Sequence, residues 1–267
     1  MLDPESIPGS LRDTHDLLVA RIEDASLAVA QPRQQSFYDG WLLRNSPGKA
    51  KRACCINALG AGDLPLSEKI SYCMDFYQRR SLPCLFRITP FSRPGELDMA
   101  LAAASFIAYQ DTRVMKLELS DVGVKESSDS QVQSVDVDTF TSAFSMLHGL
   151  DAQKTREEQE RYSRSAIVGE YVAQFDGDVP IACGTVALDG ALAGIFGMVT
   201  AAAYRGRGIA TRLMSELLSS ARKAGALTAY LQVEADNIPA RQTYAKFGFE
   251  DCYAYWYRTR DLSKDHP

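Results

Sequence analysis

The sequence predicts an α/β fold (of the α+β type) built from two similar halves. Helical patterns alternate with short apolar stretches typical of strands, which favours mixed layers over separate all-α and all-β units. Turn signals at Asp176-Gly177-Asp178 and at Asp189-Gly190 indicate hairpins, and hence antiparallel strands. Each half ends with a strand, a helix and a strand in that order, which indicates two copies of one fold.

The length of 267 residues admits one large domain or two ordinary ones. Because the sequence pattern repeats, we expect a first domain at residues 1–120 and a second at 134–267. Residues 121–133 are polar and rich in Ser and Asp, so we expect them to form the linker between the two domains.

The first half shows three helical patterns and four strand patterns. The expected helices cover residues 13–30, 66–79 and 97–106, and the expected strands cover 37–43, 52–59, 84–88 and 112–119. Asp13 or Thr14 is the expected cap of the first helix. Asp39-Gly40 interrupts the first strand as a turn or a bulge.

The second half continues the alternation. The expected helices cover residues 139–149, 153–164, 209–224 and 239–247, and the expected strands cover 168–176, 180–188, 191–199, 228–233 and 252–257. The helix that begins at Ile209 has the clearest pattern, since Leu213, Leu217 and Ala221 follow at intervals of four.

Composition and charge narrow the classes of function. Hydrophobic residues make up 46% of the chain and charged residues 24%, which is typical of a soluble globular protein. The net charge of −5 argues against broad nucleic-acid binding. No stretch has the length and apolar character of a membrane span or a secretory signal. We therefore expect a cytoplasmic protein with neither nucleic-acid nor membrane partners.

The six cysteines form no C-x-x-C pair, and the three histidines are far apart in the sequence. This distribution argues against a zinc site, so we expect no metal cofactor. Scattered cysteines among apolar residues are more often buried thiols in a reducing compartment, which agrees with the expected location.

The loop Tyr204-Arg205-Gly206-Arg207-Gly208 lies between an apolar strand and the helix that begins at Ile209. Free backbone N–H groups at the positive end of a helix attract phosphate, and glycines let an anion approach the backbone closely. A tight turn with solvated arginines is the alternative. The loop is not a P-loop, because no Lys-Ser/Thr pair follows, nor a dinucleotide loop, because Thr211 replaces the third glycine.

Two motifs in the second half resemble a known family. Arg205, Gly208 and Ala210 fit the pattern [Q/R]-x-x-G-x-[G/A], which resembles the pyrophosphate loop of the GNAT superfamily of acyl-CoA-dependent N-acetyltransferases. The segment LQVEADNIPARQTYAKFGF is similar to the closing strand, Asn turn and helix of that family, and ends on Tyr244-x-x-x-Gly248-Phe249. The motifs cover residues 134–267, and the first half resembles the family only in layout.

The resemblance implies two GNAT-like domains, each with a mostly antiparallel mixed sheet flanked by helices. Between Leu59 and Pro65 the first half has no arginine, and Asp63 would repel a phosphate. We therefore expect a degenerate first copy that binds no cofactor. It serves either as a scaffold or as a wall of the substrate pocket of the second half.

The resemblance also implies where acetyl-CoA, the co-substrate, binds. Its pantetheine arm is expected along the fourth strand of the family, and its pyrophosphate on the glycine loop. The implied contacts are Met198, Val199, Thr200, Arg205, Gly206, Arg207, Gly208, Ile209, Ala210, Asn237 and Tyr244. Asn237 alternatively caps a helix, and Tyr244 alternatively packs in the core.

Two catalytic groups follow from the same comparison. Tyr244 matches the tyrosine that protonates the departing CoA sulfur. The fourth strand carries no carboxylate, so Glu234, at the end of the fifth strand, is the candidate general base, with Asp236 as a second. A water chain without a dedicated base, or carboxylates that are simply solvated, are the alternatives.

The predicted function is transfer of the acetyl group of acetyl-CoA to a primary amine by direct attack in a ternary complex. The acceptor is a small-molecule or peptide amine, and the oligomeric state is not predicted. Four aromatic residues of the final strand line the acceptor pocket or face the core: Tyr253, Tyr255, Trp256 and Tyr257. Cys252 leaves a covalent route open. A non-catalytic acyl-CoA-binding regulatory module and a site for another phosphorylated ligand are the alternative functions.

Overall fold

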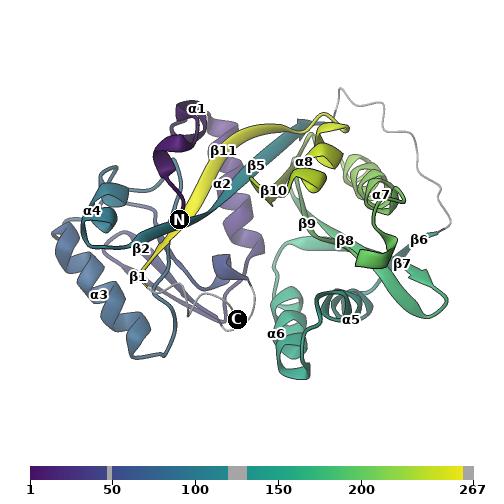
Figure 1. Ribbon diagram of the computed structural model, residues 1–267, viewed down its shortest axis with the longest axis horizontal. Coiled ribbons are helices and arrows are strands. Elements are labelled where there is room, and N and C mark those ends of the chain that lie inside the picture. Colours follow the sequence, from purple (N-terminus) through teal and green to yellow (C-terminus); the bar gives the residue numbers. More distant parts are fainter. Residues whose placement is uncertain (47–49, 120–130, 261–267) are drawn as a thin grey trace.

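A computed structural model describes residues 1–46, 50–119 and 131–260. In these ranges the strands form one eleven-stranded sheet in the order β1-β2-β3-β4-β11-β5-β10-β9-β8-β7-β6. Only β3 with β4 and β9 with β10 are parallel, and the other neighbours are antiparallel. The predicted α/β fold with a mixed sheet flanked by helices is confirmed (Figure 1).

The first half keeps the expected order of helices and strands, but the expected strand 37–43 is a hairpin of two strands and the expected strand 52–59 is reduced to residues 56–58. Its elements are η1 (Pro4–Ser6), α1 (Gly9–Arg12), α2 (Leu17–Val29), β1 (Gln34–Tyr38), β2 (Trp41–Asn45), η2 (Lys51–Ala53), β3 (Ile56–Ala58), α3 (Leu66–Gln78), β4 (Phe86–Ile88), α4 (Leu97–Ala103) and β5 (Ile107–Glu118). Asp39-Gly40 is the turn of the β1–β2 hairpin. Neither Asp13 nor Thr14 caps α2, because Asp16 accepts the first-turn N–H groups of Leu18 and Val19.

The second half begins with a strand that the sequence pattern did not predict. Its elements are β6 (Val132–Val135), α5 (Val137–His148), α6 (Ala152–Ser163), β7 (Val168–Asp176), β8 (Val179–Asp189), β9 (Leu192–Thr200), η3 (Ala202–Tyr204), α7 (Ile209–Lys223), β10 (Thr228–Glu234), α8 (Ile238–Ala245) and β11 (Glu250–Thr259). Of the predicted linker, residues 121–130 lie outside the described residues, while β6 includes Val132 and Gln133.

The two halves exchange their final strands. In each half a helix connects two parallel strands, β3-α3-β4 in the first and β9-α7-β10 in the second. A short helix and a further strand follow, α4-β5 and α8-β11. Strand β11 then pairs with β4 of the other half, and β5 pairs with β10 of the other half. Figure 1 shows β5 and β11 crossing the centre of the molecule between the two groups of helices.

Buried side chains of the helices cover both faces of the sheet. In the second half, Leu213 and Leu217 of α7 pack against one face of β8 at Ala182. Phe140 of α5 packs against the other face at Cys183. None of the helices in the described ranges combines the length and apolar character that a membrane span requires.

The aromatic residues of β11 belong to the core. Tyr253, Tyr255, Trp256 and Tyr257 are all at most 5% exposed, and they pack in clusters that include α2 and the strands of the first half. The expectation that some of them line an acceptor pocket is therefore wrong. The strand exchange places β11 between two other strands and beneath helices of the first half, so both of its faces are covered.

A buried ion pair joins three elements near this junction. Arg87 of β4 donates to both carboxylate oxygens of Glu23 on α2, and the Tyr253 hydroxyl of β11 donates to the same carboxylate at 2.6 Å. Burial opposes ionisation of Glu23, but Arg87 and Tyr253 outweigh it, and the pKa of Glu23 is lowered. Removing one partner would leave an uncompensated buried charge, which is strongly destabilising.

Candidate active site

Strands β9 and β10 diverge halfway along their length. They pair from Leu192 with Thr228 to Ile195 with Leu231. Beyond Ile195, β9 stays paired with β8 and β10 stays paired with β5. The backbone of β9 beyond Ile195 is therefore not bonded to β10, and its edge faces the gap between the two strands.

A bulge in β9 lies at the point of divergence. Phe196 pairs with Thr185 and Val199 pairs with Cys183, so Gly197 and Met198 oppose the single residue Gly184. Gly197 has φ of 61°, a conformation that glycine adopts without steric cost. A bulge of this kind bends the strand away from its neighbour, which accounts for the opening.

A pocket of about 430 Å³, which we call the divergence pocket, occupies this opening. Strands β9 and β10 supply Ile195 to Met198 and Leu231 to Glu234, and the following turn and helix supply Asn237 and Tyr244. Helices α5 and α6 add Phe144, His148, Arg161 and Tyr162, and the first half adds Val29, Ala30, Ala50 and Arg52. The sequence left open whether the first half is only a scaffold, and the structure shows that it forms part of this wall.

Tyr244 both packs in the core and lines the pocket. Its ring meets the ring of Phe249 edge to face, with centroids 6.2 Å apart. Burial raises the pKa of the Tyr244 hydroxyl above its ordinary value of 10.0. The hydroxyl therefore keeps its proton at neutral pH and is able to donate it.

Asn237 likewise has two possible roles, as a helix cap and as a residue of the pocket wall. Its side-chain oxygen accepts the backbone N–H of Ala240 at 3.3 Å and so caps α8, which has a proline in its first turn. Asn237 also lines the pocket. The capping role is confirmed, and the contact with the cofactor arm stays a prediction.

Glu234 is the one predicted carboxylate that lines the pocket, since Asp236 is not among the lining residues. The Glu234 carboxylate accepts a hydrogen bond of 2.8 Å from the side-chain amide of Gln110 on β5. The Gln110 amide oxygen in turn accepts from Lys51 of η2, also at 2.8 Å. The first half thus holds Glu234 in place, a relation that spacing in the sequence did not indicate.

The glycine loop has the geometry of an anion site. Gly206 and Gly208 have φ of 75° and 73°, and Gly208 at the N-cap of α7 leaves that helix without a side-chain cap. The first N–H groups of a helix have no carbonyl partner within it, so those of Ile209 and Ala210 are available to a ligand. Arg205 and Arg207 are exposed, and in the described part of the chain neither forms an ion pair.

Of the other predicted contacts, Met198 lines the divergence pocket, while Val199 and Thr200 continue along β9 toward the loop. Arg207 and Ile209 line a separate hollow of about 460 Å³ beside β7 and β8. The predicted site residues therefore form a continuous track from the pocket, along the open edge of β9, to the N-terminus of α7.

Residues 136–249 match the acetyltransferase (GNAT) family. All the predicted site residues lie in this matched segment. Over 249 residues the chain is 25% identical to the uncharacterized N-acetyltransferase YobR of Bacillus subtilis (strain 168), covering 91% of this chain and 98% of that protein.

Solved structures share the fold over most of the chain. A GCN5-related N-acetyltransferase from Kribbella flavida superposes with a TM-score of 0.67 at 14% identity, covering 92% of this chain and 96% of the other. A tandem GNAT protein from the clavulanic acid biosynthesis pathway gives a TM-score of 0.57 at 16% identity, covering 72% and 68%. These likenesses extend the GNAT fold beyond the segment that the family model matches.

The loop before α3, which connects β3 to that helix as the glycine loop connects β9 to α7, already holds an anion. The carboxylate of Asp39 accepts the N–H groups of Asp63 and Leu64, both at 3.0 Å, and pairs with buried Lys69 at 3.0 Å. Hydrogen bonds from these N–H groups and Lys69 lower the pKa of Asp39 to about 2. The chain thus places its own carboxylate at the loop before α3, whereas the glycine loop before α7 is left open.

The cysteine that left a covalent route open lies outside the pocket. The Cys252 thiol donates to the backbone carbonyl of Val114, and burial raises its pKa to about 12. A thiol with so high a pKa has little thiolate at neutral pH, so Cys252 is a poor nucleophile.

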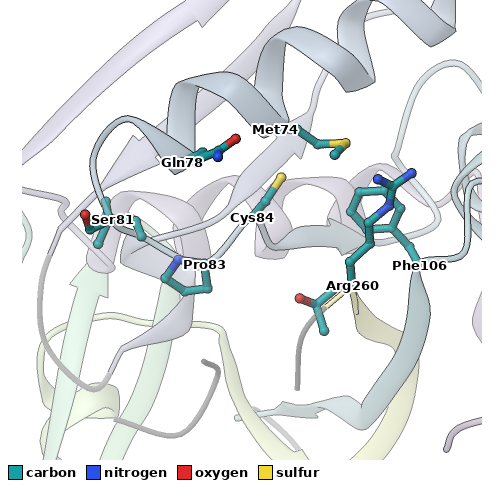
Figure 2. Close-up of a pocket in the computed structure, with 9 residues that line it drawn as sticks. Met74, Gln78, Ser81, Pro83, Cys84, Phe106 and Arg260 are labelled. Atoms are coloured by element: carbon teal, nitrogen blue, oxygen red, sulfur yellow. The ribbon is translucent and has the colours of Figure 1, made fainter. Parts of the chain in front are cut away.

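A further pocket of about 390 Å³ lies in the first half (Figure 2). The side chains of Met74 and Cys84 approach it from α3 and from the segment before β4. The guanidinium of Arg260 lies over the ring of Phe106, 4.9 Å from its centre, and donates to the carbonyl of Ala104. This pocket contains none of the predicted site residues.

Proposed function

We propose that the protein is an N-acetyltransferase that moves the acetyl group of acetyl-CoA to a primary amine by direct attack in a ternary complex. The observation that carries the proposal is the divergence of β9 from β10 at the Gly197 bulge, beside a pocket that leads to the open loop of α7. The match of residues 136–249 to the GNAT family supports it.

The donors along this track fit acetyl-CoA. Backbone groups of Met198, Val199 and Thr200 would pair with the amides of the pantetheine arm, as a neighbouring strand would. The pyrophosphate would bind the loop from Arg205 to Ala210, where backbone N–H groups and two arginines meet the end of a helix dipole. The first half would bind no second molecule, because Asp39 already occupies the corresponding loop.

The chemical step needs a neutral amine, support for the tetrahedral oxyanion and a proton for the leaving sulfur. Glu234, directly or through water, takes a proton from the ammonium. The amine nitrogen then forms a bond to the acetyl carbon to give a tetrahedral intermediate. The carbon–sulfur bond breaks as Tyr244 gives its proton to the sulfur, and the nitrogen loses its remaining extra proton, which returns through water to the Tyr244 oxygen. The position of Cys252 outside the pocket favours this direct route over a covalent intermediate.

The first test is a thermal melt with acetyl-CoA, with free CoA and without ligand. Ligand at about 100 times its dissociation constant adds roughly 2.7 kcal/mol to the free energy of unfolding, so both should raise the melting temperature clearly. The variant Gly208→Asp places a side chain and a negative charge at the loop and should abolish the shift. A melt that saturating CoA leaves unchanged would refute the proposed cofactor site.

A non-catalytic acyl-CoA-binding module is the second candidate, and the lack of a carboxylate on β9 favours it. Both candidates predict the thermal shift. Release of CoA thiol from acetyl-CoA in the presence of amines separates them, because only an enzyme turns over.

A further inference from the structure

Arg52 brings an uncompensated positive charge to the divergence pocket. It lies in η2 of the first half and lines the pocket, with its guanidinium carbon 5.4 Å from the centre of the Phe196 ring on β9. Its Nε is buried without a hydrogen-bond partner. Within the described residues its side chain forms no ion pair and no hydrogen bond, so ring stacking alone positions it.

The other cations near the pocket are engaged. Arg161 donates through two nitrogens to the buried carboxylate of Glu158. Lys51 donates to Gln110 and lies over the ring of Tyr109. Glu23 is a carboxylate within electrostatic range of Arg52, but its two oxygens already accept from Arg87 and Tyr253. The charge of Arg52 is therefore left for a ligand to balance.

The position of Arg52 along β9 separates it from the cofactor phosphates. Phe196 and Thr200 pair with Thr185 and Ala182, three residues apart on β8, which in a strand is roughly 10 Å, and the glycine loop begins farther on. With the pantetheine arm along Met198 to Thr200, Arg52 lies past the thioester end. A ligand that meets Arg52 in the pocket is therefore the acceptor.

We propose that Arg52 binds a carboxylate of the acceptor, so that the acceptor is a small amino carboxylate. This inference rests on the proposed acetyl transfer. A planar guanidinium matches a carboxylate in geometry, and a single guanidinium balances its single charge. Glu234 on the same pocket complements the ammonium group, so the pocket presents one charge of each sign to a zwitterion. Its volume of about 430 Å³, shared with the thioester end, suits a small molecule.

The test compares amino carboxylates with their neutral carboxamides. The pairs are L-lysine and L-lysinamide, L-phenylalanine and L-phenylalaninamide, and glycylglycine and its amide, assayed by CoA thiol release. For any pair that the enzyme accepts, the carboxylate should have the higher kcat/KM. Arg52→Gln should lower kcat/KM for the carboxylate about tenfold or more and leave the carboxamide nearly unchanged, as expected for loss of a charged hydrogen bond. Arg52→Lys should retain part of the preference.

Two controls keep the outcome interpretable. Arg80→Gln makes the same change at an exposed arginine of the first half, and kcat/KM should stay the same for both the carboxylate and the carboxamide. A melt of the CoA-saturated protein with the N-acetyl carboxylate or the N-acetyl carboxamide reports binding without turnover, and the carboxylate should stabilise only proteins that keep Arg52.

The outcomes separate this inference from the function on which it rests. No thermal shift with acetyl-CoA and no thiol release with any amine would overturn the acetyl transfer itself. Turnover in which carboxamides match or exceed the carboxylates would overturn the role of Arg52 alone. An equal loss of kcat/KM for the carboxylate and the carboxamide in Arg52→Gln would also overturn it, because an equal loss indicates a structural role.

Discussion

At the scale of single residues, the key position is Tyr244, where burial and access to the pocket coincide. Helix α8 and Phe249 hold the ring while the side chain lines the pocket beside Glu234 and Asn237. Packing alone would be satisfied by phenylalanine. Any role of Tyr244 beyond packing therefore depends on its hydroxyl, and a variant that lacks only the hydroxyl tests that role.

The variant Tyr244→Phe tests the proton donor. Turnover should fall about a hundredfold or more, in line with the usual contribution of a positioned acid, while the thermal shift with CoA should persist. Because burial raises the pKa of Tyr244, the alkaline fall of kcat in the wild type should lie above pH 10, and the variant should lack it. Tyr72→Phe, in the exposed part of α3, is the matched control. An unchanged kcat in Tyr244→Phe would assign the sulfur proton to another donor.

At the scale of residues, the sequence is informative where its signals are local, and the roles predicted for the site residues stay predictions. The glycine loop and the Tyr-x-x-x-Gly-Phe segment specify backbone shape within a few residues, and the track from Met198 to Ala210 follows from them. Arg52, which lines the pocket, and Gln110, which contacts Glu234, were missed because they come from distant points of the chain. The pattern around each of them is that of an ordinary strand or loop.

At the scale of elements, the loops before α3 and α7 both present backbone N–H groups, but only the loop before α3 has them occupied by the chain itself. The loop before α7 leaves its N–H groups available, whereas the loop before α3 binds the carboxylate of Asp39. The sequence predicted that the loop before α3 would repel phosphate because of the charge of Asp63. The Asp63 backbone contributes an N–H to Asp39, a carboxylate from the β1–β2 turn.

Asp39→Asn should destabilise the protein at neutral pH. The folded-state pKa of about 2 lies below the ordinary 3.8, so the ionised carboxylate stabilises the fold above pH 4 and loses this effect as the pH falls through about 2. The difference in urea midpoint between wild type and variant should therefore narrow as the pH is lowered from 7 toward 2. Asp63→Asn is the control, because only the backbone of Asp63 contacts Asp39. A difference independent of pH would contradict the role of charge.

Helices and hairpins were predicted well because their signals lie within the segment. Helix α7 and the hairpins of β7, β8 and β9 fall almost where periodicity and Asp-Gly turns placed them. Strands β3 and β4 are shorter than their apolar runs suggest, since Cys55 and Leu85 are buried beyond the ends of the two strands. Burial sets the extent of an apolar run, and pairing sets the extent of a strand.

At the scale of the molecule, exchange of β5 and β11 joins the two halves in one sheet. Strand β11 pairs with β5 from Glu250 with Lys116 to Thr259 with Ile107. The sequence indicated the repeat, but two copies side by side and two copies with exchanged strands have the same local pattern. Only the pairing of distant segments distinguishes the two arrangements, and the boundary at residues 121–133 stays a prediction.

The full chain should therefore unfold in a single transition. Trp41 and Trp256, the two tryptophans, both lie in the core of the first half, and far-UV circular dichroism reports both halves. Urea curves from fluorescence and from circular dichroism should coincide. A fragment of residues 131–260, which lacks β5, should show no cooperative transition. Two separate transitions in the full chain would show that the halves fold independently in spite of the exchange.

The exchange also has a consequence for the newly made chain. Strand β4 pairs with β3 early, but its second neighbour, β11, is synthesised only about 160 residues later. At roughly 5–20 residues per second, this delay is on the order of ten seconds or more. Throughout that time the ribosome carries a first half whose central sheet edge is open. Chaperones that recognise exposed strands would meet the chain at this stage, before any pocket exists to bind a substrate.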